Sequence, residues 1–502
     1  MQGAPRCCNI SPALAARKAG QRRRRAQIQD KAALLITIDY DLRPDGLASK
    51  IDRLWELSAR KIADLEKKWD DSRGSPVFTA DGAYTARGWT DWTQGFRCGS
   101  AILQYDATGE PSFLETGLRN TRRLMPPHVT HTGVHDHGFN IISTYGNLRR
   151  LTLEDKLDAA SGDLEMFELA LKASGAVQAM RWTVTGPGTG YIYSFNGPHS
   201  LFADTIRSLR SLAVAHMLGH ELLGEQDERI SLLERLLQHA DSTAQFTVYY
   251  GEGRDSYDMR GRVAHESIFN TKSGRYRCPS TQQGYSPFTT WTRGLAWVML
   301  GYAEQLEFLA ACCAEELARS SSSERGFPAY MKAATATCDF YIEQTPSDGI
   351  PYWDTGAPDL SLLGEYLGRP ADPFNDYEPV DSSAAAIAAQ GLLRLGRYLE
   401  FAGESEAGKR YWQAGLTVLR TLLDEPYLST SETHQGLLLH SIYHRPNGWD
   451  HVPHGSKIPC GESSMWGDYH LREVALLLQR IIRNEPSYTF YGAANGGTSH
   501  GG

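Results

Sequence analysis

The residues best suited to proton chemistry lie between residues 130 and 140. Asp136 stands there between His135 and His137, in a segment broken by glycines, and four of the chain's 16 histidines fall within residues 128–137. Small residues let the backbone turn sharply and let a ligand approach closely, and a carboxyl group among imidazoles is suited to acid–base catalysis. The alternative is a polar loop whose histidines make ordinary hydrogen bonds.

A second candidate acid is Asp204, at the start of an amphipathic segment. Apolar residues between 202 and 217 recur at helical spacing, and Ser200 is predicted to cap the amino end of this helix. Asp204 lies off the apolar stripe, in the first turn. Either the helix dipole simply stabilises an ionised Asp204, or burial or a neighbouring acid raises its pKa enough for general-acid catalysis.

Aromatic and basic residues elsewhere suit the binding of a sugar acid. Arg293 and Trp297 are four residues apart, so on a helix they share a face that can hold a planar carboxylate beside a ring. Trp92 follows Trp89 by three residues and is suited to wall a sugar subsite. The alternatives are an Arg stacked on Trp at the surface, and tryptophans that fill the core.

Helices must position these residues, because helical periodicity dominates the chain from Ala48 onward. The first helix is marked by apolar residues between 51 and 65 and ends at Lys67-Lys68. Further helices are predicted near 98–105, 112–124, 138–147, 163–174, 201–219, 228–239, 288–311, 328–343, 381–401, 405–424 and 466–483. Strand-like runs are few, such as 178–184 and 246–250. The pattern predicts an all-α fold, an (α/α) barrel whose connecting loops form a bowl at one end.

The composition is that of a soluble globular protein, with 41% hydrophobic and 22% charged residues. The balance of 51 basic against 59 acidic residues does not suggest a nucleic-acid surface. No apolar run approaches the length of a membrane span, and the eight cysteines include no CxxC pair. We expect a cytoplasmic protein without nucleic-acid or membrane partners.

The two ends of the chain differ from its middle. Residues 1–30 are rich in arginine, as in a transit peptide or a basic tail, and Asp30 is the first acid. We predict a basic, disordered extension over residues 1–45, a catalytic domain over 46–490 and a Gly-rich flexible tail over 491–502.

The candidate residues fall in collinear blocks between about residues 48 and 485. These blocks are Trp92–Phe96, His135-Asp136 with Gly138-Phe139, Asp204, His265, Gln283–Tyr285, Arg293-Gly294 with Ala296-Trp297, Pro351–Asp354, Asp381–Ala386, Leu438–His440 with Tyr443, and Trp466–Tyr469. In this order they resemble the unsaturated glucuronyl hydrolases, glycoside hydrolase family 88. Each block alone is weakly specific, but so many in one order are a strong signal.

The resemblance implies an (α/α)6 barrel of six helical hairpins. It also implies removal of a 4,5-unsaturated uronic acid from the non-reducing end of oligosaccharides left by polysaccharide lyases. Because the substrate is a vinyl ether, the spacing rule for paired glycosidase carboxylates does not apply. Protonation of C4 gives an oxocarbenium-like cation at C5, water captures it, and the resulting hemiketal opens with release of the linked sugar. One acid gives the proton and activates the water, while a second carboxylate stabilises the positive charge.

Residue by residue, the resemblance assigns Asp204 as the general acid/base and Asp136 as the assisting carboxylate. The residues expected to line the sugar site are Trp92, His135, His265, Gln283, Arg293, Trp297 and Tyr443. No metal or cofactor is implied. The expected partner is a small anionic oligosaccharide, bound by a monomer or a homodimer.

The sequence departs from the family pattern in three places. Residues 286–290 read Ser-Pro-Phe-Thr-Thr where the family often has acids, and Arg97-Cys98 stands where an aromatic residue and a proline are common. Residues 444–460 resemble an insertion, and basic and hydroxyl side chains there are candidates to meet a sulfate on the next sugar. These candidates are Arg445, His454, Ser456 and Lys457.

Three alternative functions remain open. A related unsaturated rhamnogalacturonyl hydrolase would perform the same chemistry on pectic fragments, although the Asp381–Ala386 block favours the glucuronyl family. A metal hydrolase would use His131, His135, Asp136 and His137 as ligands, but the glycines argue against the helix that such spacing needs. A non-catalytic sugar-binding barrel would need neither aspartate.

Overall fold

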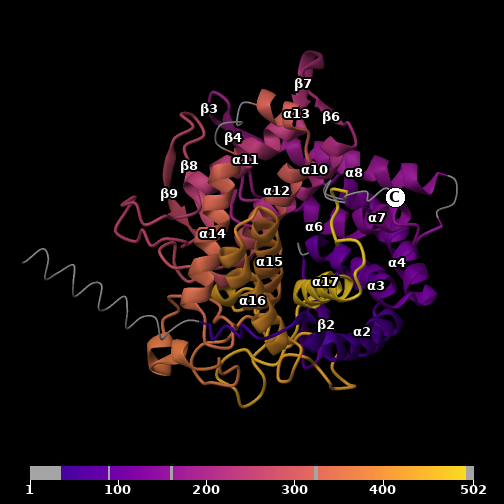
Figure 1. Ribbon diagram of the computed structural model, residues 1–502, viewed down its shortest axis with the longest axis vertical. Coiled ribbons are helices and arrows are strands. Elements are labelled where there is room, and N and C mark those ends of the chain that lie inside the picture. The colour runs from indigo at the N-terminus through magenta and orange to yellow at the C-terminus, as the bar shows by residue number, and fades with distance from the viewer. Residues whose placement is uncertain (1–35, 89–90, 159–161, 321–325, 493–502) are drawn as a thin grey trace, which may run out of the picture.

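The computed structural model of the chain describes residues 36–88, 91–158, 162–320 and 326–492 (Figure 1). Residues 1–35 of the predicted extension and the glycine-rich tail from residue 493 lie outside the described residues. The prediction of disorder is corrected for residues 36–45, because Ile36 is 2% exposed and its N–H donates to the carbonyl of Ile342 at 3.2 Å. Among the described residues, no helix is long and apolar enough to cross a membrane.

Six helical segments of the described chain form an inner ring. They are α3 (Gln94–Thr108), α6 (His137–Ile141) continued through a π-helical turn (Ile142–Gly146) into α7 (Asn147–Leu153), α9 (Thr205–Ser208) with α10 (Arg210–Met217), α12 (Thr292–Ala311), α15 (Ser382–Phe401) and α17 (Met465–Ile482). Each segment contacts the next, and α17 contacts α3, so the ring is closed.

A second layer of helices surrounds this ring in the described part of the chain. It consists of α2 (Ala48–Lys68), α4 (Pro111–Leu124), α8 (Asp163–Met180), α11 (Leu232–Phe246), α14 (Gly326–Gln344) and α16 (Ser405–Leu422). Each outer helix contacts an inner helix next to it in the sequence, as α16 contacts α15 and α14 contacts α12. The predicted (α/α)6 barrel is confirmed.

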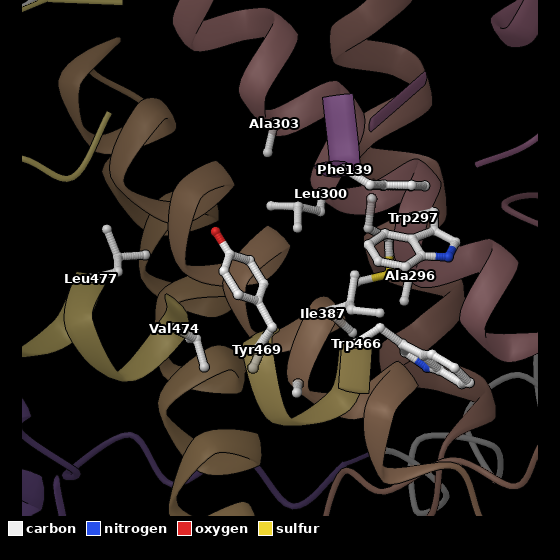
Figure 2. Close-up of a cluster of buried hydrophobic side chains, with 14 of the residues drawn as sticks. Phe139, Ala296, Trp297, Leu300, Ala303, Ile387, Trp466, Tyr469, Val474 and Leu477 are labelled. Carbon is white, nitrogen blue, oxygen red and sulfur yellow. The ribbon is translucent and has the colours of Figure 1, made fainter. Parts of the chain in front are cut away.

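Hydrophobic burial explains the two layers. In α2 one face is buried and the opposite face carries charges, as an outer helix requires. By contrast, α12 and α15 are buried nearly all round. Their side chains meet those of α17 inside the barrel, where Figure 2 shows Leu300, Ile387 and Trp466 together. Glycine permits close packing of α15 on α16, since a Cβ on Gly396 would lie 2.7 Å from the main-chain N of Trp412.

Short antiparallel strands are inserted between the helices. They are β1 (Pro76–Ala80) with β2 (Ala83–Ala86), β3 (Trp182–Gly186) with β4 (Thr189–Ile192), β6 (Glu221–Leu223) with β7 (Arg229–Ser231), and the three-stranded sheet β5 (Ser200–Phe202), β8 (Glu266–Phe269) and β9 (Tyr276–Ser280). In this sheet Phe202 pairs with Glu266, and the N–H of Ala203 donates to the carbonyl of His265 at 2.9 Å. The register therefore brings Asp204 beside His265.

The predicted helix over residues 201–219 is corrected at its start. Ser200–Phe202 is a strand, and the Ser200 hydroxyl donates to Glu266 at 2.5 Å instead of capping a helix. Pairing with β8, more than 60 residues further on, outweighs the local helical pattern. The strand predicted over 178–184 is also shifted, because α8 continues to Met180 and the strand begins at Trp182.

Candidate active site

Asp136 and Asp204 converge on the two ring nitrogens of His135. Nε2 of His135 lies 3.1 Å from Oδ2 of Asp204, and Nδ1 lies 3.3 Å from Oδ1 of Asp136. The main-chain N–H of His135 also donates to Oδ1 of Asp136 at 3.0 Å. His135 is only 2% exposed, so this imidazole joins two carboxyl groups that are 68 residues apart in the sequence.

The three groups shift one another's pKa. Burial disfavours the charged form of His135, but Asp136 and Asp204 outweigh burial and raise its pKa above the ordinary value. Burial, together with the nearby charge of Asp204, raises the pKa of Asp136. Burial acts in the same direction on Asp204, but His135 and His265 hold the pKa of Asp204 below its ordinary value. The proton of the cluster therefore favours His135 over Asp204.

Close contact between α6 and α9 brings the two acids together. A Cβ on Gly138 would lie 2.2 Å from the carbonyl oxygen of Ser208, so only glycine fits this crossing. The N–H of Gly138 donates to Oγ of Ser208 at 2.9 Å. Gln178 of α8 joins the two segments by donating to the carbonyl of His135 at 2.7 Å and to Oγ of Ser208 at 3.0 Å.

A buried ion cluster fixes the helix that follows Asp204. The side chain of Arg207 is wholly buried and lies 2.8 Å from Glu304 of α12 and 2.9 Å from Glu473 of α17. The N–H of Arg207 donates to the carbonyl of Asp204 at 3.0 Å. Because a buried guanidinium is costly unless it is paired, these contacts fix α9 against the inner helices.

His265 presents a neutral imidazole N–H to the site. Its Nδ1 accepts hydrogen bonds from the main-chain N–H groups of Gln282 at 3.0 Å and Gln283 at 3.3 Å, so the ring proton resides on Nε2. Burial lowers the pKa of His265 to about 4. Within the described chain, the buried Nε2 makes no hydrogen bond. His265 is therefore a preformed donor close to Asp204.

Arg293 is held entirely inside the protein. Its two terminal nitrogens each donate to two protein oxygens, so they carry no spare donor for a substrate. The acceptors are Oδ2 of Asp381, Oε1 of Gln283 and the main-chain carbonyls of Ile442 and Tyr443. The predicted direct contact with a substrate carboxylate does not fit these bonds. Arg293 positions Gln283 and the Tyr443 backbone instead.

The predicted pairing of Arg293 with Trp297 is also corrected. The guanidinium lies over the rings of Trp291, at 4.7 Å, and Trp466, at 4.9 Å. Trp297 is 3% exposed and packs 4.8 Å from Phe139 (Figure 2), so it belongs to the core beneath the site. Helical spacing predicts a shared face, but it cannot show which aromatic residues other helices bring to that face.

Trp92 and Tyr443 form one aromatic wall with Trp466. Trp92 stacks on Trp466 with ring centroids 5.1 Å apart, and Tyr443 lies 4.9 Å from Trp466. The hydroxyl of Tyr443 is hydrogen-bonded to Trp92, and burial raises the pKa of Tyr443 to about 12. Trp92 is half-buried, so this wall is suited to pack against a sugar ring.

Three carboxyl groups that support the site were not among the predicted site residues. Asp381 caps α15 and accepts from Arg293 at 2.8 Å. Asp354 accepts the N–H of Tyr285 at 2.9 Å, and Asp450 accepts the main-chain N–H groups of Tyr443 and His444. Asp354 and Asp381 both stand in blocks that carry the family resemblance, which was a signal for them, whereas Asp450 stands in none of these blocks.

A cavity lies at the other end of the barrel. It measures about 740 Å³ and is lined by the carboxyl ends of α12 and α15, by α7 and by residues 485–492. Arg293 and Asp381 lie at the amino ends of the same two helices, which are 20 residues long and so span about 30 Å. None of the predicted site residues lines this cavity.

The alternative metal site is not formed by the histidines that were considered for it. The two ring nitrogens of His137 lie 2.8 Å from the Ser174 hydroxyl and 2.9 Å from the carbonyl of His131. Among the described residues, no three His, Cys, Asp or Glu side chains are grouped so that they could hold a metal ion.

The chain is similar to known proteins over most of its length, although no protein-family model matches it. It is 25% identical over 409 residues, or 78% of this chain and 81% of the other, to an unsaturated glucuronyl hydrolase of Formosa agariphila. It is 26% identical to an unsaturated glucuronyl hydrolase of Bacillus sp. strain GL1, over 83% of this chain and 93% of that protein. An unsaturated chondroitin disaccharide hydrolase of Streptococcus agalactiae is 23% identical over 77% of this chain and 81% of its own length.

Solved structures show the same fold. An unsaturated glucuronyl hydrolase specific for heparin has a TM-score of 0.64 at 20% identity, over 87% of this chain and 98% of that protein. The unsaturated glucuronyl hydrolase of Bacillus sp. GL1 has a TM-score of 0.64 at 21% identity, over 88% of this chain and 100% of that protein. The resemblance predicted from the collinear motifs is confirmed.

Proposed function

We propose that this chain, a relative of the unsaturated glucuronyl hydrolases, releases a 4,5-unsaturated uronic acid from the non-reducing end of lyase-generated oligosaccharides. The observation that carries the proposal is the convergence of Asp136 and Asp204 on His135. A sugar-binding module does not need two acids held on one buried imidazole. A reaction that transfers a proton to carbon and takes a proton from water needs such acids.

The reaction begins with protonation of C4 by Asp204. Positive charge then develops at C5 and the ring oxygen, and the negative end of the Asp136–His135 pair stabilises it. The Asp204 carboxylate left by the first step accepts a proton from water as the water oxygen bonds to C5. The hemiketal opens and the linked sugar leaves, so one water is consumed and Asp204 recovers its proton.

Proton placement explains how Asp204 acts as an acid although His135 and His265 hold its pKa below the ordinary value. His135 holds the proton 3.1 Å from Oδ2 of Asp204. An anionic sugar that enters the site excludes water and adds negative charge, and both changes raise the pKa of Asp204. The proton then passes from Nε2 of His135 to Asp204.

Substrate recognition uses the remaining side chains. The Nε2–H of His265 is the donor for a substrate carboxylate or hydroxyl. Trp92, which the buried rings of Trp466 and Tyr443 support, packs against a sugar ring. Arg293 keeps Gln283 and Tyr443 in place. A solved unsaturated glucuronyl hydrolase of Streptococcus agalactiae, similar to this chain with a TM-score of 0.59 at 18% identity, is a complex with the sulfated disaccharide dGlcA-GalNAc6S. In this chain the candidates in residues 444–460 to meet such a sulfate are Arg445, His454, Ser456 and Lys457. Of these, Lys457 is already paired with Asp376 at 2.9 Å.

A comparison of two substrate classes tests this function. The unsaturated uronic acid has a conjugated C4=C5 bond whose ultraviolet absorbance disappears on hydration. We expect purified protein to remove this absorbance from glycosaminoglycan-derived unsaturated disaccharides faster than from pectin-derived ones. Faster loss from the pectic disaccharide would identify a rhamnogalacturonyl hydrolase instead, and no loss from either would contradict the proposal.

A further inference from the structure

A pair of exposed aromatic rings lies on the loops that lead into the site. Tyr257 is 52% exposed and Phe288 is 42% exposed, yet the two rings stack with centroids 4.3 Å apart and an interplanar angle of 23°. Tyr285, on the same loop as Phe288, is 50% exposed. Three exposed aromatic side chains on neighbouring loops form a surface of the kind that marks an interaction site. We call Tyr257, Tyr285 and Phe288 the aromatic ledge.

Hydrogen bonds hold the two loops of the ledge in place. Arg262 is 3% exposed and donates through Nε to the carbonyl of Tyr257 at 2.8 Å and through a terminal nitrogen to the carbonyl of Pro287 at 3.1 Å. The N–H of Phe288 donates to the Ser286 hydroxyl at 3.1 Å. The ledge is therefore preorganised, which lowers the entropy cost of binding.

The ledge lies on the same two loops as His265 and Gln283 of the candidate active site. Arg262 precedes His265 by three residues, and Phe288 follows Gln283 by five. Since an extended chain covers at most about 3.6 Å per residue, the Cα of Phe288 lies within roughly 18 Å of that of Gln283. Between them, the N–H of Tyr285 is bound to Asp354. The ledge is therefore within reach of an oligosaccharide that extends out of the site past Gln283.

The chemistry of the ledge suits the outer sugars of an acidic oligosaccharide. Aromatic faces pack against the apolar faces of sugar rings. Residues 286–290 carry no charge, so this part of the loop presents no carboxylate to repel an anionic chain. On the basis of the proposed function, we propose that the aromatic ledge binds the sugars beyond the first linkage of the substrate, and that the enzyme prefers unsaturated tetrasaccharides to disaccharides.

Chain-length dependence of kcat/KM tests the ledge. Unsaturated di- and tetrasaccharides from one glycosaminoglycan are compared on the wild-type protein, on the double variant Tyr257→Ala/Phe288→Ala and on Phe401→Ala. The last is a matched control, because Phe401 is 73% exposed but lies at the far end of α15. We expect the ratio of tetrasaccharide to disaccharide kcat/KM to fall about five- to tenfold in the double variant and to stay unchanged in Phe401→Ala.

Each outcome of this comparison decides the inference. Equal loss on both substrates, or an unchanged ratio, overturns the ledge while disaccharide turnover still supports the proposed function. If neither substrate is turned over, the proposed function fails, and calorimetric titration with the tetrasaccharide then decides the ledge alone. In that titration, weaker binding by the double variant than by Phe401→Ala supports the ledge, and equal affinity overturns it.

Discussion

Replacement of Gly138 by alanine tests how closely the two acidic segments must approach. The added Cβ would lie 2.2 Å from the carbonyl oxygen and 2.6 Å from the Cα of Ser208. Backbone atoms cannot yield as a flexible side chain does, so α6 and α9 must separate by roughly 1 Å to restore an ordinary contact. The hydrogen bond from Gly138 to the Ser208 hydroxyl is then lost as well.

The consequences for stability and for activity differ in size. Overpacking of a tight core contact costs about 1–3 kcal/mol of the free energy of unfolding. The same shift moves Asp204 away from His135, and a displacement of about 1 Å in a catalytic group reduces kcat on the order of 100-fold. We therefore expect Gly138→Ala to fold with a lower Tm and to lose nearly all turnover.

Thermal unfolding followed by circular dichroism and kcat from the ultraviolet assay measure the two effects. Gly46→Ala is the matched control, because a Cβ on Gly46 would meet no atom within 4 Å. If Gly138→Ala keeps both the Tm and the kcat of Gly46→Ala, the reasoning from the α6–α9 contact is refuted.

Three further predictions concern charge. His135 has a raised pKa, so its pairing stabilises the fold fully below the ordinary value of 6.5, and this stabilisation is lost as pH rises through the folded-state pKa. We expect the activity of the wild type to fall as pH rises through the same range. His135→Gln should lower kcat at least 100-fold and abolish this decrease at high pH. A wild-type pH profile in the variant would contradict the placement of the proton on His135. Arg293→Lys should lower both Tm and kcat/KM, because an ammonium cannot reach the four acceptors of the guanidinium. Each acceptor left buried without a partner lowers the free energy of unfolding by about 1–3 kcal/mol. A higher KM at an unchanged Tm would instead indicate direct contact with the substrate. Incubation with a chelator such as EDTA should leave turnover unchanged, and loss of activity restored by zinc would revive the metal-hydrolase alternative.

The barrel was predictable because its signals are local. Amphipathic outer helices and nearly uniform apolar inner helices each leave a pattern within about 20 residues, as α2 and α15 show. The strand at Ser200–Phe202 was not, because its partner β8 begins at Glu266 and a three-residue strand has no periodicity of its own. Sequence patterns report the neighbours of a residue along one element, and this strand depends on a neighbour across a sheet.

The candidate site was predictable in its members more than in their contacts. Asp136, Asp204 and His135 lie together, as predicted. The spacing of Arg293 and Trp297 predicted that Arg293 binds a substrate carboxylate. The guanidinium instead donates to Asp381 and to the carbonyl of Tyr443. Those partners come from other helical hairpins, 88 and 150 residues away. Which acceptors the Arg293 guanidinium binds depends on these distant residues, and a local sequence motif does not identify them.

Asp204, held against His135 and opposite Asp136, is proposed to protonate the vinyl ether and to activate the water that hydrates it. The most direct measurement follows the absorbance of a glycosaminoglycan-derived unsaturated disaccharide with wild-type protein and with Asp204→Asn, alongside calorimetric binding to the variant. The account predicts rapid loss of absorbance with the wild type, and retained binding without turnover in Asp204→Asn. Turnover by Asp204→Asn at a near-wild-type rate would contradict it.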